Sequence, residues 1–88
     1  MDINKIKEIY GEDKLELFKG NIDIVSKNIL YLKKIGIDET NELIESYAPI
    51  FLYDNNEFIN KINLLIRKLG DNYIDKIYDN IGVLEELL

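Results

Sequence analysis

The chain contains no cysteine and no histidine, and it has a single proline. The absence of cysteine excludes disulfides and thiolate metal sites, so the fold must be held by its core alone. The absence of histidine removes the commonest general base and the commonest transition-metal ligand. Nothing in the local sequence activates the remaining candidate nucleophiles, which are the serines, Thr40, the lysines and the carboxylates. We therefore expect a protein that is not an enzyme and that binds no metal and no cofactor.

Long apolar runs are also absent. No stretch approaches the ~20 apolar residues of a membrane span, and residues 1–8 alternate charge with isoleucine instead of forming the apolar region of a signal peptide. The composition, 47% hydrophobic and 32% charged, is typical of a globular fold. We expect one domain over residues 1–88, located in the cytoplasm and without membrane contact.

The charge of the chain is acidic, with a net charge of -6. Domains that grip phosphate without regard to sequence are usually basic. Acidic residues gather near the expected helix starts, where capping and solvation account for most of them. The balance of charge therefore favours a protein partner over a nucleic acid.

Apolar residues recur at spacings of three and four along most of the chain, which predicts an all-α fold. The two longest predicted helices each end at a glycine, Gly36 or Gly70. Pro49 closes a shorter helix that begins at Glu39 after the cap candidate Asp38. The predicted helices and helical turns are, in chain order, 2–10, 12–19, 22–35, 39–48, 50–53, 55–69, 72–81 and 83–88.

Sliding the sequence on itself by 34 residues places Gly36 on Gly70 and brings the rest of the pattern into register. Asn21 then meets Asn55, and the basic pair at 33–34 meets the basic pair at 67–68. The segment 1–20 matches the back half of a unit. We therefore expect a helical repeat of about two and a half units, or a bundle-like stack. The units are the half repeat 1–20 and the repeats 21–54 and 55–88.

The order of long helix, glycine, shorter helix and proline differs from the tetratricopeptide repeat, which has a similar period. It resembles the repeat of the mitochondrial transcription termination factor (mTERF) family. The resemblance is carried by 32–37 (Leu-Lys-Lys-Ile-Gly-Ile) with 48–52 (Ala-Pro-Ile-Phe-Leu), and more weakly by 66–70 with 82–84. It spans residues 21–88 and implies a curved helical array.

The same resemblance implies nucleic-acid binding by cations at equivalent positions of the two units. These cations are Lys27, Lys33, Lys34, Lys61, Arg67 and Lys68. Two features depart from the family pattern: Val83 replaces the expected proline, and the chain has few repeats. The same cations also complement the negative ends of two helix dipoles, which requires no ligand. Nucleic-acid binding is therefore kept as the alternative.

The leading expectation is a non-catalytic protein-interaction module, including an inhibitor or immunity-type protein that occludes its partner. Repeat arrays need polar caps on their end units, yet this chain ends on apolar residues. An uncapped end either folds back or docks, so self-association through this end is a further expectation. The candidate partner-binding residues are Tyr53, Tyr73, Tyr78, Leu84, Leu87 and Leu88. Most tyrosines are also expected to belong to the core, with their hydroxyls reaching its rim.

Overall fold

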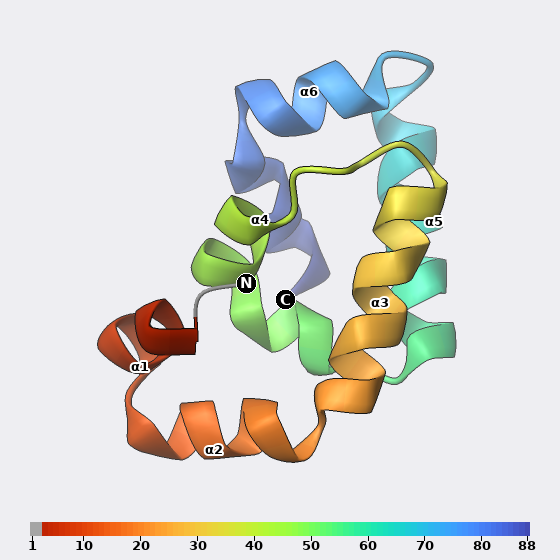
Figure 1. Ribbon diagram of the computed structural model, residues 1–88. Coiled ribbons are helices and arrows are strands. Elements are labelled where there is room, and N and C mark those ends of the chain that lie inside the picture. Colours follow the sequence, from red (N-terminus) through yellow and green to blue (C-terminus); the bar gives the residue numbers. More distant parts are fainter. Residues whose placement is uncertain (1–2) are drawn as a thin grey trace.

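The computed structural model describes residues 3–88, which form an arrangement of six α-helices and two 3-10 helices (Figure 1). No strand occurs in this range, so the predicted all-α fold is confirmed. The elements are α1 (Ile3–Tyr10), α2 (Glu12–Gly20), α3 (Ile22–Lys34), α4 (Asn41–Tyr47), η1 (Ala48–Leu52), α5 (Asn55–Leu69), α6 (Tyr73–Asp79) and η2 (Ile81–Leu87). None of the helices in this range is both long and apolar enough to cross a membrane.

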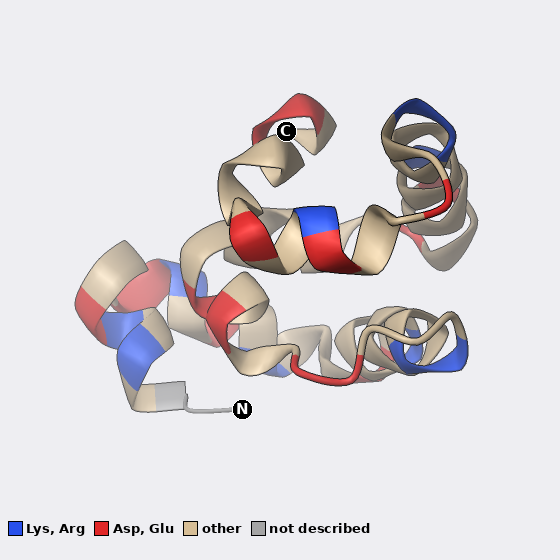
Figure 2. Ribbon diagram, turned by 90° about the horizontal axis from the view of Figure 1, so that it is seen from above, with Lys and Arg blue, Asp and Glu red and all other residues tan. Residues whose placement is uncertain are grey.

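The order of a long helix, a short helix and a 3-10 helix occurs twice, as α3–α4–η1 and as α5–α6–η2. Residue 22, where α3 begins, lies 33 residues before the start of α5, close to the 34-residue offset of the sequence. The two units are stacked: in Figure 2 the second unit forms the upper layer of the picture and the first unit the lower layer. The long helices α3 and α5 lie on one side of this stack and the short helices lie beside them. Helices α1 and α2 pack on the first unit, where α1 contacts α4.

The glycines at the ends of the two long helices adopt positive φ angles, 97° at Gly36 and 83° at Gly70. These angles suit glycine, and they allow the chain to turn sharply out of α3 and α5. Gly36 has a second role. A Cβ at this position would lie 2.8 Å from Cδ1 of Ile74 on α6. The same glycine therefore ends a helix of the first unit and lets the second unit approach it closely.

The core is apolar and draws residues from every helix of the described chain. Phe51 of η1 and Phe58 of α5 lie at its centre, with ring centroids 5.5 Å apart. Ile6 and Phe18 extend this core to α1 and α2. Such burial contributes roughly 1.5–3 kcal/mol for each large side chain and is the main stabilising term of the fold.

One amide, that of Asn28 on α3, is completely buried in this core, with 0% of its surface exposed. Its Nδ2 donates to the carbonyl oxygens of Phe51 and Tyr53, both at 2.9 Å. Its Oδ1 accepts a hydrogen bond from Nδ2 of Asn55, also at 2.9 Å. A single side chain thus pairs carbonyls at the end of η1 and reaches the first residue of α5.

The start of α4 differs from the prediction. The helix was expected from Glu39 with Asp38 as its cap, but it begins at Asn41 and Thr40 is the residue before it. The Glu39 N–H donates to the Tyr78 hydroxyl at 3.0 Å. That hydrogen bond connects the segment before α4 to the second unit.

We predict that Asn28→Ala lowers the free energy of unfolding by about 3 kcal/mol, because it leaves two carbonyls and one amide without their partner. Urea unfolding followed by circular dichroism measures this change. Asn60→Ala on the exposed face of α5 is the control and should shift stability by less than about 0.5 kcal/mol. A loss below about 1 kcal/mol for Asn28→Ala would contradict the role given to this amide.

Candidate functional site

Charge is divided between the long helices and the segments that follow them (Figure 2). Residues 21–34 and 55–69 each carry three cations against one carboxylate. Residues 35–54 carry five carboxylates and no cation, and residues 70–88 carry five carboxylates and one cation, Lys76. The long helices are therefore basic, whereas the segments 35–54 and 70–88 that follow them are acidic.

A groove of about 340 Å³ opens on the acidic side, between α1, the junction of α4 with η1, and η2. We call it the Tyr47 groove. It is lined by Tyr10, Ser46, Tyr47, Pro49, Ile81, Glu85 and Leu88. A second groove of about 220 Å³, the Tyr78 groove, is lined by Glu39, Asn41, Glu42, Leu43, Tyr78 and Ile81. Because Ile81 lines both, the two grooves adjoin.

Five of the six tyrosine hydroxyls form hydrogen bonds inside the protein. Three hydroxyls donate: Tyr31 to Asn63 Oδ1 (2.5 Å), Tyr53 to the Leu87 carbonyl (2.8 Å) and Tyr73 to the Ile35 carbonyl (2.6 Å). Two hydroxyls accept: Tyr10 from the Ala48 N–H (3.3 Å) and Tyr78 from the Glu39 N–H (3.0 Å). Every one of these bonds joins one repeat unit to the next. These tyrosines therefore hold the units together.

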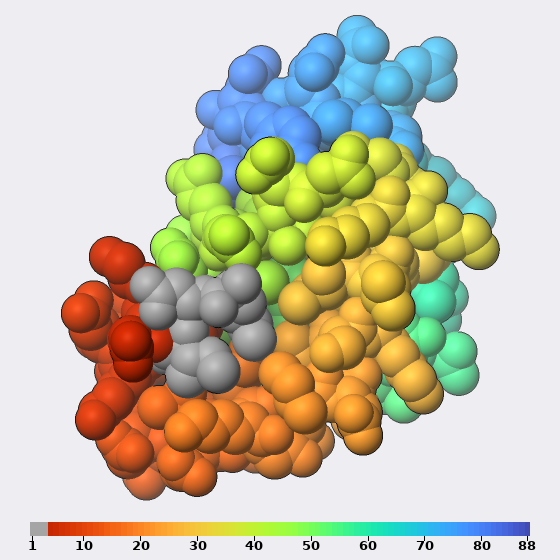
Figure 3. All heavy atoms as spheres, viewed as in Figure 1, coloured from red at the N-terminus to blue at the C-terminus, as the bar shows by residue number. Residues whose placement is uncertain are grey.

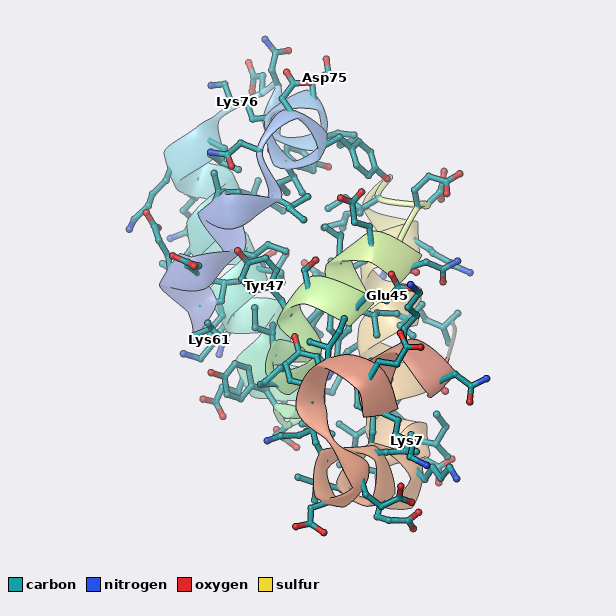
Figure 4. All side chains as sticks on the ribbon, turned by 90° about the vertical axis from the view of Figure 1, so that its left-hand side faces the viewer. Lys7, Glu45, Tyr47, Lys61, Asp75 and Lys76 are labelled. Atoms are coloured by element: carbon teal, nitrogen blue, oxygen red, sulfur yellow. The ribbon has the colours of Figure 1, made fainter. Side chains whose placement is uncertain are left out.

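The sixth hydroxyl, that of Tyr47, has no hydrogen-bond partner within residues 3–88. Its side chain is half-buried and lines the Tyr47 groove. In Figure 4 it lies in the middle of the view, between η2 and α4. The ring is half-buried by the fold, while the hydroxyl forms no hydrogen bond within residues 3–88. The sequence gives no signal that separates Tyr47 from the other tyrosines.

Two of the predicted partner-binding residues, Leu84 and Leu87, belong to the core, with exposed fractions of 4% and 5%. The expectation that they form an exposed docking surface is therefore corrected. The end of the chain folds back, because η2 packs against α5 and α4 and buries the inner face of its turns. Leu88 is the exception, since it is 60% exposed and lines the Tyr47 groove.

The three predicted tyrosines also divide. Tyr53 and Tyr73 are half-buried, and their hydroxyls are paired with carbonyls of other units, so they serve the fold. Their assignment as partner anchors stays a prediction. Tyr78 is exposed and lines the Tyr78 groove, with its hydroxyl held by Glu39 N–H. Its ring therefore remains available at the surface.

Five of the six candidate nucleic-acid-binding cations are exposed on α3 and α5, which lie side by side. They are Lys27, Lys33, Lys34, Arg67 and Lys68. The sixth, Lys61, is half-buried, and its Nζ lies 5.0 Å from the centre of the Tyr53 ring. Lys68 is engaged in an ion pair with Glu86 at 3.0 Å. Four of the six cations thus lie on the surface without an ion-pair partner among residues 3–88.

Two findings on the described residues concern metal ligands and the cavity in the core. No group of three or more carboxylates within residues 3–88 is arranged to hold a metal ion. The enclosed cavity at the centre of the core measures about 10 Å³ and is lined by apolar side chains such as Leu32, Phe58 and Ile77. That volume is about that of one water probe, so this core cavity has no room for a ligand.

Comparison of the chain with protein-family models, with curated proteins and with solved structures found no match. The resemblance to the mTERF repeat therefore stays a hypothesis that these comparisons do not test. The Tyr47 groove combines the exposed side chain of Leu88 with a tyrosine hydroxyl that forms no hydrogen bond within residues 3–88.

Replacing single tyrosines by phenylalanine tests the division between structural and free hydroxyls. We predict that Tyr73→Phe lowers the free energy of unfolding by about 1 kcal/mol, because it removes a part-buried hydrogen bond. Tyr47→Phe should change it by less than about 0.3 kcal/mol, since its hydroxyl has no partner to lose. Urea unfolding measures both variants, and a loss for Tyr47→Phe equal to that for Tyr73→Phe would contradict this assignment.

Proposed function

We propose that this chain is a non-catalytic protein-interaction module of the cytoplasm that binds a protein partner in the Tyr47 groove. By occupying a surface of that partner it would act as an inhibitor or immunity-type protein does. The observation that carries this proposal is the Tyr47 hydroxyl, which is left unpaired while the other five hydroxyls are used inside the protein.

Tyrosine is enriched at the energetic centres of protein interfaces, because its ring contributes apolar area and its hydroxyl contributes one directed hydrogen bond. Tyr47 has both properties available. Leu88 adds an exposed apolar side chain, and Ser46 and Glu85 add polar groups at the edge. An apolar centre with a polar edge is the usual composition of a protein-binding patch.

The groove is also held in shape before binding. One wall is Tyr10, whose hydroxyl is fixed by the N–H of Ala48. The chain continues into Pro49, whose φ angle is restricted by its ring, and then into the core residue Ile50. A surface that is already ordered loses little conformational entropy on binding, which raises affinity for a given contact area.

Photo-crosslinking tests the position of the interface. We predict that benzoylphenylalanine at Ser46 forms covalent products with one protein in a lysate of the native host. The same group at Ser26, an exposed serine on α3, should not form them. Mass spectrometry of the products identifies the partner. The product at Ser46 should also be lost when Tyr47→Ala is added, because the anchor of the interface is then missing.

The two serines form a matched pair, since both are exposed and both lie in α-helices of the same chain. Equal products at both positions would indicate unspecific contact. Absence of any product at Ser46 would remove the proposed groove from consideration as an interface. Circular dichroism of each labelled protein verifies that it remains folded.

The alternative function is nucleic-acid binding, and the observation that favours it is the basic character of the two long helices. The mTERF resemblance places the same cations at its binding surface. Against it stand the net charge of -6 and the internal use of Lys61 and Lys68. Four free cations would contact few phosphates, and the carboxylates of the short helices lower the potential around them.

Salt dependence separates the two functions. We predict no binding of a labelled 20-nucleotide DNA or RNA duplex at 150 mM salt, measured by fluorescence anisotropy. If phosphates do bind the long helices, the logarithm of the association constant should fall with that of salt at a slope of roughly -4, at about 0.9 per contact. The double variant Lys33→Glu with Lys34→Glu should then abolish binding. That outcome would favour the alternative.

A further inference from the structure

The carboxylates that line the two adjoining grooves are free of ion pairs. Glu39, Glu42 and Glu85 form no ion pair within residues 3–88. The carboxylates that do form ion pairs lie elsewhere, on α1, α2 and the outer turn of η2. The negative charge of the grooves is therefore not balanced by any cation of the described chain.

Lys76 is the single cation of the acidic segments 35–54 and 70–88, and it does not pair with the carboxylates of the grooves. The ammonium group of Lys76 on α6 donates to the Leu69 carbonyl, at the end of α5. It caps a helix of the second unit and is absent from the lining of both grooves. Figure 4 shows Lys76 near Asp75 at the far end of the molecule from α1. We therefore expect a negative potential at the grooves.

We infer that the partner segment bound in the Tyr47 and Tyr78 grooves is rich in lysine or arginine and carries one large apolar side chain between its cations. The inference rests on the proposed function and adds the chemistry of the occupant. The apolar side chain would lie against Tyr47, Ile81 and Leu88. The cations on either side of it would reach Glu85 in one groove, and Glu39 and Glu42 in the other.

The tyrosine rings favour the same occupant. A cation over an aromatic face is attracted by the electrons of the ring, and the protein itself uses this contact where Lys61 lies over Tyr53. Tyr47 and Tyr78 offer further rings within the acidic grooves. An acidic or neutral segment would meet unbalanced carboxylates at the same positions, so the grooves select against it.

A second copy of the chain is the competing occupant. On α3 the exposed apolar residue Leu30 is flanked in the sequence by Lys27, Lys33 and Lys34. This segment therefore matches the proposed occupant, which has an apolar side chain between cations. Docking of α3 into the groove of another copy would be a head-to-tail contact, which builds a ring or an open filament depending on the rotation between copies. We assign the groove to a different protein, and sedimentation of the chain tests the second copy as the occupant.

The test uses the full chain and a fluorescein-labelled heptapeptide with glycine ends, in which one leucine has two lysines on each side. Fluorescence polarisation measures binding at 20 and at 150 mM salt. Control peptides replace every lysine by glutamate, or the leucine by glycine. We expect the lysine peptide to bind, with weaker binding at high salt, and both control peptides to bind at least about tenfold more weakly.

Matched variants locate the binding. Glu85→Gln should weaken the lysine peptide by about fivefold, and Tyr47→Ala by at least as much. Glu57→Gln, an equivalent change on α5 away from both grooves, should have an effect of less than about twofold. These variants replace exposed or half-buried groups, and urea unfolding verifies that each is folded.

Three outcomes would overturn the inference. The first is equal binding of the glutamate peptide, or no binding of the lysine peptide at concentrations up to about 1 mM. The second is equal weakening by Glu57→Gln and Glu85→Gln. The third is self-association in sedimentation that Leu30→Glu abolishes, because the occupant is then a second copy. The crosslinking experiment separates this inference from the proposed function. A Ser46 crosslink to a partner segment without lysine or arginine would contradict the inference and still support the proposed function. A missing crosslink would contradict the proposed function itself.

Discussion

The buried amide of Asn28 is the interaction on which the arrangement of the two units depends. It pairs carbonyls at the end of η1 and reaches Asn55 at the start of α5. An unpaired polar group in this position would destabilise the fold, so the three hydrogen bonds must form together. They fix the connection between the first unit and the second against the middle of α3. The direction of α5, and with it the position of α6 and η2, follows from this connection.

Tyrosine hydroxyls then join the units along their length, since five bonds each span one repeat boundary. A repeat protein is stabilised mainly by contacts between neighbours, and here directed hydrogen bonds supplement the apolar contacts. Tyr47 is the exception among the six tyrosines. Its ring lines a groove, and its hydroxyl forms no hydrogen bond within residues 3–88, so the fold does not depend on that hydroxyl.

The distribution of charge follows from helix physics and has a consequence for binding. Cations lie in the last turns of the long helices, where they complement the negative ends of the helix dipoles. Most of the other carboxylates lie on the shorter segments, and those that line the grooves form no ion pair within residues 3–88. One side of the molecule, formed by the long helices, is therefore basic, and the other side, formed by the segments that follow them, is acidic and contains the grooves. We therefore propose a basic protein segment, and not a nucleic acid, as the occupant of the grooves.

The sequence by itself determined the helices, the glycines that end the long ones, and the order of elements within each unit, because hydrophobic spacing and backbone preferences act locally. It did not determine which side chains the neighbouring unit would cover. Leu84, Leu87 and Leu88 look alike in the sequence, yet folding back of η2 buries the first two and exposes the third. The six tyrosines look alike in the sequence as well. Five of their hydroxyls form hydrogen bonds when one unit packs on the next, whereas the Tyr47 hydroxyl forms none within residues 3–88. The sequence could not show this difference, because each of the five bonds joins residues that are distant in the sequence.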